Sequence, residues 1–191
     1  MKRLTILVSI LITVPAFALT MTPKPGDRIG VLRMSGRYGD RAERTIANTI
    51  QNDLIGELQA LGYKAFDTKM TYDELLRGGP QDAEYYVEVL SSDAAGRPVG
   101  GAGAAVGGVA VEVGVVVSRV AAEVRLYDGR SLVPAGTYDL KRDNTAVVPT
   151  GIGVAGRSIW AGIMLPFVQY GELRRAAHDV AHQAALRIAG Q

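Results

Sequence analysis

The feature that most constrains the fold is a strict two-residue alternation between Val109 and Val117. Valine stands at every odd position, whereas the even positions hold alanine, glutamate, glycine and valine. Side chains of a β-strand point alternately to the two faces of its sheet, so this period predicts a strand with one continuous valine face. Glycine is too frequent around the alternation for a helix.

Two apolar, glycine-rich segments follow from this pattern, at 98–118 and 145–170. Glu112 is the only charged residue in the first segment, and Arg157 is the only one in the second. The alternation is close to the length that a transmembrane strand needs, and the second segment is predicted to be a further apolar hairpin with Trp160 as an interface anchor. Alternatively, both segments pack against the rest of the domain or against a partner subunit.

The candidate pore or interface residues lie in these segments. They are Glu112, Val113, Val115, Arg157 and Trp160. Glu112 has three open interpretations: it could line a pore, pair with Arg125, or face water on an exposed sheet.

The chain outside these segments alternates between strand and helix patterns. The strongest helix runs from Asp40 to Gly62, because apolar residues recur in it every four positions and glycine follows as a C-terminal cap. Thr71 and Glu74 form a capping box that opens a short helix. The expected strands are 29–34, 64–67, 84–90, 120–127 and 132–141, the last two joined at Asp128-Gly129, and a closing helix spans 172–189.

The order of these elements predicts an α/β fold. It is β-α-β-α-β, followed by a glycine-rich β insertion, a hairpin and a C-terminal helix. This order is typical of a two-layer or three-layer sandwich with a mixed sheet, and we expect a single domain over 28–191.

The N-terminus predicts export. Lys2 and Arg3 precede an uncharged, mostly apolar stretch and the small-x-small pattern at 16–18, so we expect a signal peptide at 1–18 and an extended lead-in at 19–27. We therefore expect the periplasm as the destination, with outer-membrane association as an extension. The chain has no cysteine, which predicts that it is not a lipoprotein, because acylation needs a cysteine at the mature N-terminus.

Composition argues against a nucleic-acid partner. The predicted signal peptide holds two of the 21 basic residues and none of the 19 acidic ones, so the rest of the chain is formally neutral. Basic residues of the rest of the chain cluster no more densely than in adjacent pairs such as Arg174-Arg175, whereas nucleic-acid binding needs a basic patch.

The sequence shows no convincing catalytic centre, and we expect no enzyme activity, cofactor or metal. The G-x-G-x-x-G pattern at 151–156 lacks the strand, helix and second half that dinucleotide binding requires. His178 and His182 have the four-residue spacing that places two imidazoles on one helix face, but no third ligand is evident nearby. Because of this spacing, a secreted metal-dependent hydrolase that uses the two histidines is kept as the second alternative function.

Several phrases resemble the CsgG-type envelope proteins, which include the curli secretion channel and periplasmic accessory relatives. The phrases are Leu126-Tyr127-Asp128-Gly129 and Val133-Pro134-Ala135-Gly136, with the 29–34 strand and the helix that ends at 58–63. The resemblance covers roughly residues 28 to 189 and implies a non-enzymatic protein. In the channel members two hairpins per subunit build a shared pore wall, and 98–118 and 145–170 fall where these hairpins would be. Those members are lipoproteins, whereas this chain has no cysteine.

These observations together predict a cell-envelope, periplasmic accessory or assembly protein that acts by protein–protein interaction or self-assembly. The first alternative is a subunit of an oligomeric outer-membrane secretion pore.

Overall fold

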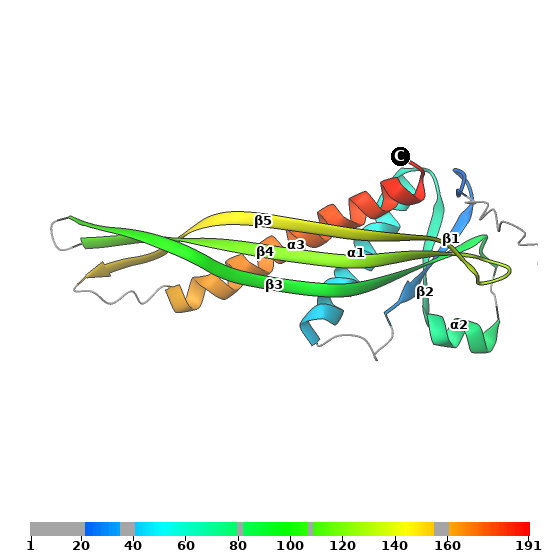
Figure 1. Ribbon diagram of the computed structural model, residues 1–191, viewed down its shortest axis with the longest axis horizontal. Coiled ribbons are helices and arrows are strands. Elements are labelled where there is room, and N and C mark those ends of the chain that lie inside the picture. The colour runs from blue at the N-terminus through cyan, green and yellow to red at the C-terminus, as the bar shows by residue number, and fades with distance from the viewer. Residues whose placement is uncertain (1–21, 35–40, 80–81, 107–108, 155–160) are drawn as a thin grey trace, which may run out of the picture.

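The fold is a mixed sheet with two long helices on one face, and it confirms the predicted α/β class (Figure 1). The computed structural model describes residues 22–34, 41–79, 82–106, 109–154 and 161–191, so the predicted signal peptide lies outside the described residues. The elements are β1 (Arg28–Arg33), α1 (Arg41–Ala60), β2 (Lys64–Thr71), α2 (Tyr72–Gly78), β3 (Tyr85–Val106), β4 (Val109–Asp128), β5 (Pro134–Val154) and α3 (Ala161–Ile188).

The sheet has five strands in the order β2-β1-β3-β4-β5. β1 runs parallel to both of its neighbours, β2 and β3, whereas β3, β4 and β5 form an antiparallel meander. β1 is therefore buried on both faces: Ile29 and Val31 contact the helices, and Leu32 packs on the opposite side. The antiparallel meander places β5 at one edge of the sheet.

The main hydrophobic core lies between the sheet and the helices α1 and α3. The predicted stripe of α1 is confirmed, because Ile46, Ile50, Leu54 and Leu58 are all buried. Gly62 follows α1 with φ 89°, the left-handed conformation expected of a C-terminal cap. α3 contributes mostly alanines to this core, and such small side chains allow a helix to approach the sheet closely.

A smaller core occupies the other face of the sheet, under α2. It is built from Leu32, Leu75, Tyr86 and Tyr127. The predicted capping box is present, since Thr71 accepts a hydrogen bond from the Glu74 backbone and Glu74 accepts one from the Thr71 backbone. α2 is only 7 residues long, so in the part of the chain that the structure describes the face opposite α1 and α3 is largely free of helical cover.

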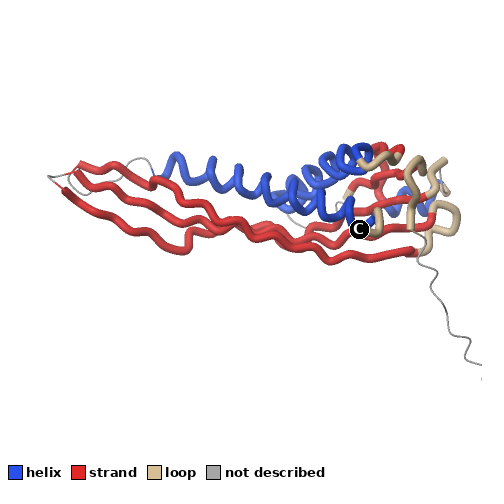
Figure 2. The backbone as a smooth tube through the Cα atoms, turned by 90° about the horizontal axis from the view of Figure 1, so that it is seen from above, coloured by secondary structure: helices blue, strands red, loops and turns tan. Residues whose placement is uncertain are grey.

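The strands β3, β4 and β5 are longer than the sequence predicted. They span 22, 20 and 21 residues and run past the start of α3 (Figure 2). β4 joins the alternation at 109–117 and the expected strand at 120–127 into one unbroken strand. The pairing of β4 with β3 continues from Asp128 to Val109, which is why no break falls between them.

The predicted apolar hairpin at 145–170 is wrong. Residues 145–154 are the end of β5, paired with β4, and residues 161–170 are the first part of α3. Hence Gly151–Val154 belong to a strand, and the rest of the glycine pattern lies outside the described residues. A bulge in β5 opposite Glu112 and Val113 absorbs one residue beside Pro149, which an edge strand tolerates.

Replacing two glycines by alanine tests this fold, because one substitution should destabilise the protein and the other should stabilise it. At Gly129 an added Cβ would lie 2.1 Å from the backbone oxygen of Ala83, so Gly129→Ala should destabilise the protein by roughly 1–3 kcal/mol or more. At Gly56, inside α1, nothing lies within 4 Å of an added Cβ. Gly56→Ala should therefore stabilise the protein by about 0.5–1 kcal/mol. Urea unfolding measures both, and equal effects of the two substitutions would contradict the packing at Gly129.

Candidate functional site

The three long strands form an extension that we call the distal ribbon. It consists of residues 96–106 of β3, 109–118 of β4 and 144–154 of β5, which pair along their length except at one bulge beside Pro98 of β3 and one beside Pro149 of β5. Figure 1 shows these strands continuing beyond the start of α3. The first candidate segment, 98–118, is therefore the hairpin of this ribbon.

Three of the five candidate residues lie together on β4 in the distal ribbon. The backbone of Glu112 lies opposite Gly103 and Gly151, and that of Val113 opposite Ala102 and Pro149. Val115 follows and is partly exposed. The side chains of Glu112 and Val113 are outside the described residues, as are Arg157 and Trp160 altogether.

Of the three open interpretations of Glu112, the pairing with Arg125 is wrong. Both residues lie on the same unbroken strand, thirteen positions apart, which corresponds to roughly 43 Å of extended chain. Arg125 instead forms an ion pair with Glu123 on the same face of β4.

The two faces of the sheet differ along β4. Its even-numbered residues from Val116 to Leu126 are buried under the helices, whereas the odd-numbered residues from Val115 to Arg125 are partly or fully exposed. We call the second side the open face. In the body of the protein this face is charged, and Arg119 Nε donates to Asp143 Oδ1 at 2.8 Å across the β4–β5 pair.

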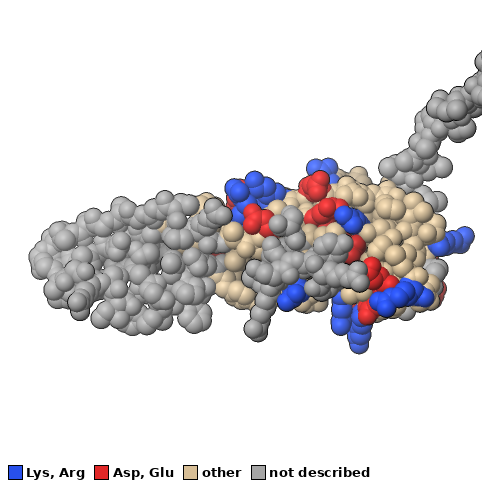
Figure 3. All heavy atoms as spheres, turned by 60° about the horizontal axis from the view of Figure 1, so that its bottom comes forward, with Lys and Arg blue, Asp and Glu red and all other residues tan. Residues whose placement is uncertain are grey.

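The open face becomes apolar where the distal ribbon begins. Val117 and Val115 follow Arg119 on β4, and Val147 lies opposite Val115 on β5 with 69% of its surface exposed. Figure 3 shows a face of the body on which basic and acidic side chains are interspersed. These three valines, of which Val147 is exposed and the other two are partly exposed, lie beside the charge-paired surface of the body and mark the boundary between two kinds of surface.

A buried polar pair lies on the open side, between β3 and β4. The hydroxyl of Tyr127 donates to Glu88 Oε2 at 2.8 Å, and Glu88 is only 3% exposed. Burial raises the pKa of Glu88, and burial together with the neighbouring carboxyl raises the pKa of Tyr127. Tyr72 of α2 stacks on the Tyr127 ring with centroids 4.4 Å apart. Sequence reasoning did not single out Glu88; the available signal was an acidic residue within the apolar strand pattern at 84–90.

The histidine pair of α3 faces two carboxylates of α1. His182 Nδ1 lies 2.7 Å from Glu57 Oε2, and His178 Nδ1 lies 3.4 Å from Asp53 Oδ2. Asp53 and Glu57 were missed as partners, although their four-residue spacing matches that of the histidines. Within the described ranges no group of three or more His, Cys, Asp or Glu residues is arranged to hold a metal ion. The histidines therefore connect two helices, and the hydrolase alternative stays a prediction.

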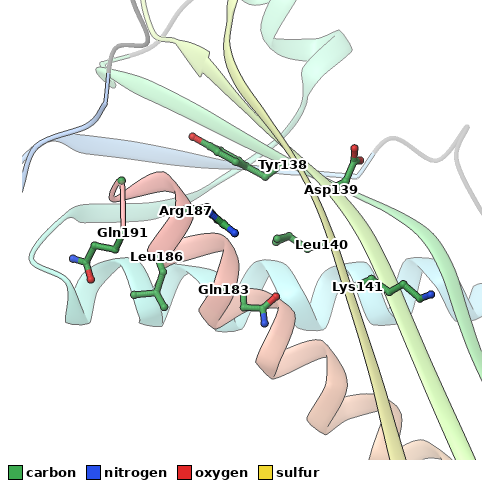
Figure 4. Close-up of a pocket in the computed structure, with 9 residues that line it drawn as sticks. Tyr138, Asp139, Leu140, Lys141, Gln183, Leu186, Arg187 and Gln191 are labelled. Carbon is green, nitrogen blue, oxygen red and sulfur yellow. The ribbon is translucent and has the colours of Figure 1, made fainter.

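A groove runs between β5 and the C-terminal end of α3 (Figure 4). Its volume is about 980 Å³. The lining residues are Tyr138, Asp139, Leu140 and Lys141 from β5, Gln183, Leu186 and Arg187 from α3, and Gly190 and Gln191 from the chain end. Burial raises the pKa of Tyr138. Nothing in the sequence pattern pointed to this groove, because its two walls are more than 40 residues apart in the chain.

None of the described helices is long and apolar enough to cross a membrane.

The sequence matches no family model and no curated protein. Several solved structures are similar in shape. A minor lipoprotein from Acinetobacter baumannii is 13% identical, over 88% of this chain and 94% of that one, with a TM-score of 0.49. A PelC dodecamer from Paraburkholderia phytofirmans is 14% identical, over 88% and 90%, with a TM-score of 0.45. Lipoprotein GNA1162 from Neisseria meningitidis is 13% identical, over 76% and 97%, with a TM-score of 0.37.

These comparisons correct the prediction that the chain is not a lipoprotein. That prediction used the lack of cysteine to separate the chain from lipoproteins, whereas proteins named as lipoproteins are among the structures similar to it.

The buried Glu88 provides a prediction about pH and stability. Because folding raises its pKa above the ordinary value of 4.5, the folded protein holds a proton that the unfolded chain releases above that value. The free energy of unfolding of the wild-type protein should therefore fall as the pH rises from about 4.5 to the raised pKa that Glu88 has in the folded protein. Glu88→Gln keeps an acceptor for Tyr127 and cannot ionise, so its free energy of unfolding relative to wild type should increase over that window.

Urea unfolding at a series of pH values tests this expectation. Asp93→Asn, at an exposed carboxylate of the same strand, is the matched control. A difference between Glu88→Gln and wild type that does not change with pH would contradict the burial of an ionisable Glu88.

Proposed function

We propose that this protein is a non-enzymatic accessory or assembly protein of the cell envelope that works by self-association through its distal ribbon. The observation that carries the proposal is the valine patch of the open face, formed by the exposed Val147 and the partly exposed Val115 and Val117, next to the edge of β5 that has no further strand partner among the described residues. The predicted export signal supports the envelope as the place of action.

The shape of the ribbon supports self-association. An edge strand presents unpaired backbone groups to any other strand, and natural proteins usually shorten or charge such edges. β5 is 21 residues long, well above the usual strand of about 5–6 residues, and its distal part lies in a charge-poor segment. Burial of the exposed Val147 side chain against another copy would contribute roughly 1.5–3 kcal/mol.

The polar residues of the described part support a role without chemistry. The two histidines contact carboxylates of α1, Glu88 bonds to Tyr127, and the charged residues of the open face form ion pairs with one another. A catalytic group has to be free to contact a substrate, whereas these side chains mostly form hydrogen bonds or ion pairs with each other.

The pore alternative is favoured by one specific observation. The valine alternation occupies nine positions of β4 in the distal ribbon, and at about 3.3 Å per residue they extend roughly 30 Å, the thickness of the hydrocarbon core of a membrane. The next open-face position on β4 after Val117 is Arg119, which forms an ion pair with Asp143 of β5, so charged residues begin where the valine alternation ends. The resemblance to CsgG-type proteins, which stays a prediction, implies the same role for this segment.

Charge placed in the valine patch tests self-association. Val147→Arg should weaken association at least about tenfold, because a desolvated, unpaired charge costs more than one kcal/mol. Light scattering over a concentration series without detergent measures the mass. Thr137→Arg, an exposed position on the body part of the same strand, should leave the mass unchanged. A wild-type protein that stays monomeric, or a Val147→Arg variant with wild-type mass, would contradict the proposal.

Flotation with liposomes separates the two functions. An accessory protein that associates in solution should stay at the bottom of the density gradient. A pore subunit should float with the vesicles, and Val147→Arg should reduce that fraction. Flotation of the wild-type protein would contradict the accessory function and support the pore subunit.

A further inference from the structure

We propose that the groove between β5 and α3 is a docking site for an extended, carboxylate-bearing peptide segment of a partner protein, which adds as a strand to the outer edge of β5. This site lies in the body of the protein, away from the valine patch, and does not depend on self-association. The inference rests on three features: a free strand edge, an apolar wall and two guanidinium groups without an acidic partner.

Among the described residues, the outer edge of β5 beside the groove has no strand partner. β5 is the last strand of the sheet and pairs only with β4. Among the hydrogen bonds between described residues, none joins the outer edge of 135–147 to another element. A strand edge with free backbone groups is the usual acceptor of an added peptide strand, because the main chain provides affinity whatever the side chains are.

The groove supplies the side-chain contacts that such a strand needs. Tyr138 and Leu140 occupy alternate positions of β5, and Leu186 of α3 also lines the groove. In Figure 4, Arg187 lies between α3 and the strand near Tyr138 and Leu140, whereas Asp139 points to the other side of β5. The lining run from Tyr138 to Lys141 matches about four residues of extended peptide, roughly 13 Å.

The charge of the groove selects the occupant. Arg187 lines it directly, and Arg142 follows on β5, where its Nε donates to the Gln183 side-chain oxygen at 2.7 Å once that amide is oriented to accept. Within the described part of the chain neither guanidinium pairs with a carboxylate, whereas Arg119, Arg125 and Arg175 all do. Guanidinium groups bind carboxylates through charge-assisted hydrogen bonds. The occupant therefore carries acidic side chains among apolar ones.

Fluorescence anisotropy with a labelled peptide tests the site. The probe is a short synthetic peptide in which valine alternates with glutamate, and the comparison peptide has lysine in place of glutamate. The full chain should bind the glutamate peptide and not the lysine peptide. Arg142→Glu and Arg187→Glu should each weaken binding about tenfold or more, and added salt should weaken binding to the wild type.

The matched control is Arg174→Glu, an exposed arginine on an earlier turn of the same helix. It changes the net charge equally and should leave binding at the wild-type level. Val147→Arg should also bind the peptide normally, which separates this proposal from self-association through the distal ribbon.

Backbone methylation distinguishes strand addition from simple charge attraction. Two versions of the glutamate peptide carry N-methyl groups on alternate residues, so that each has one edge blocked. Strand addition predicts that one version loses binding and the other keeps it. Equal binding of both versions, no binding of the glutamate peptide, or unchanged binding by Arg142→Glu and Arg187→Glu would overturn the proposal. If these variants change the mass of the protein while the peptide fails to bind, the occupant is a second copy and the proposal is overturned as well.

Discussion

The unbroken ladder between β3, β4 and β5 is the constraint on which the rest of the structure depends. Bulges occur in β3 and β5, where single residues are skipped, whereas every residue of β4 pairs in sequence with β3. β4 therefore keeps its two-residue period from the turn at Asp128 to the end of the ribbon. Because its even positions from Val116 to Leu126 are buried under the helices, the odd positions from Val115 to Arg125 all belong to the open face.

The helical cover is asymmetric, and the two faces are stabilised by different interactions. Under α1 and α3 the core is aliphatic, and the alanines of α3 keep the layers close. On the open face, α2 covers only a small aromatic cluster around Tyr86 and Tyr127. The rest relies on cross-strand pairs such as Arg119 with Asp143, which contribute little to stability individually but keep this part of the sheet solvated.

Local signals in the sequence were sufficient for the elements of the body. The four-residue stripe of α1, the capping box before α2 and the turn at Asp128-Gly129 each depend on a few neighbouring residues, and all were confirmed. The extent of β3 to β5 was not predictable, because glycine and alanine at 100–105 show no period. The segment 145–170 was assigned wrongly for a related reason: small apolar residues suit a strand end and a helix start equally. The contacts of His182 with Glu57, and of Tyr127 with Glu88, join distant parts of the chain and leave only faint signals in one sequence.

The edge strand β5 belongs to two environments, and this follows from the geometry of the ladder. Near Tyr138 its outer edge borders a groove lined by Arg187, which has no carboxylate partner among the described residues, whereas Val147 lies opposite Val115 at the start of the distal ribbon. Hydrogen bonding along a free edge has no sequence preference, so the side chains on either side decide which strand can pair there. A segment that satisfies Arg142 and Arg187 would place acidic groups in an apolar setting if it moved to the distal part. Under the two proposals made above, the change in side chains near Asn144 would therefore separate the two occupants of this one strand.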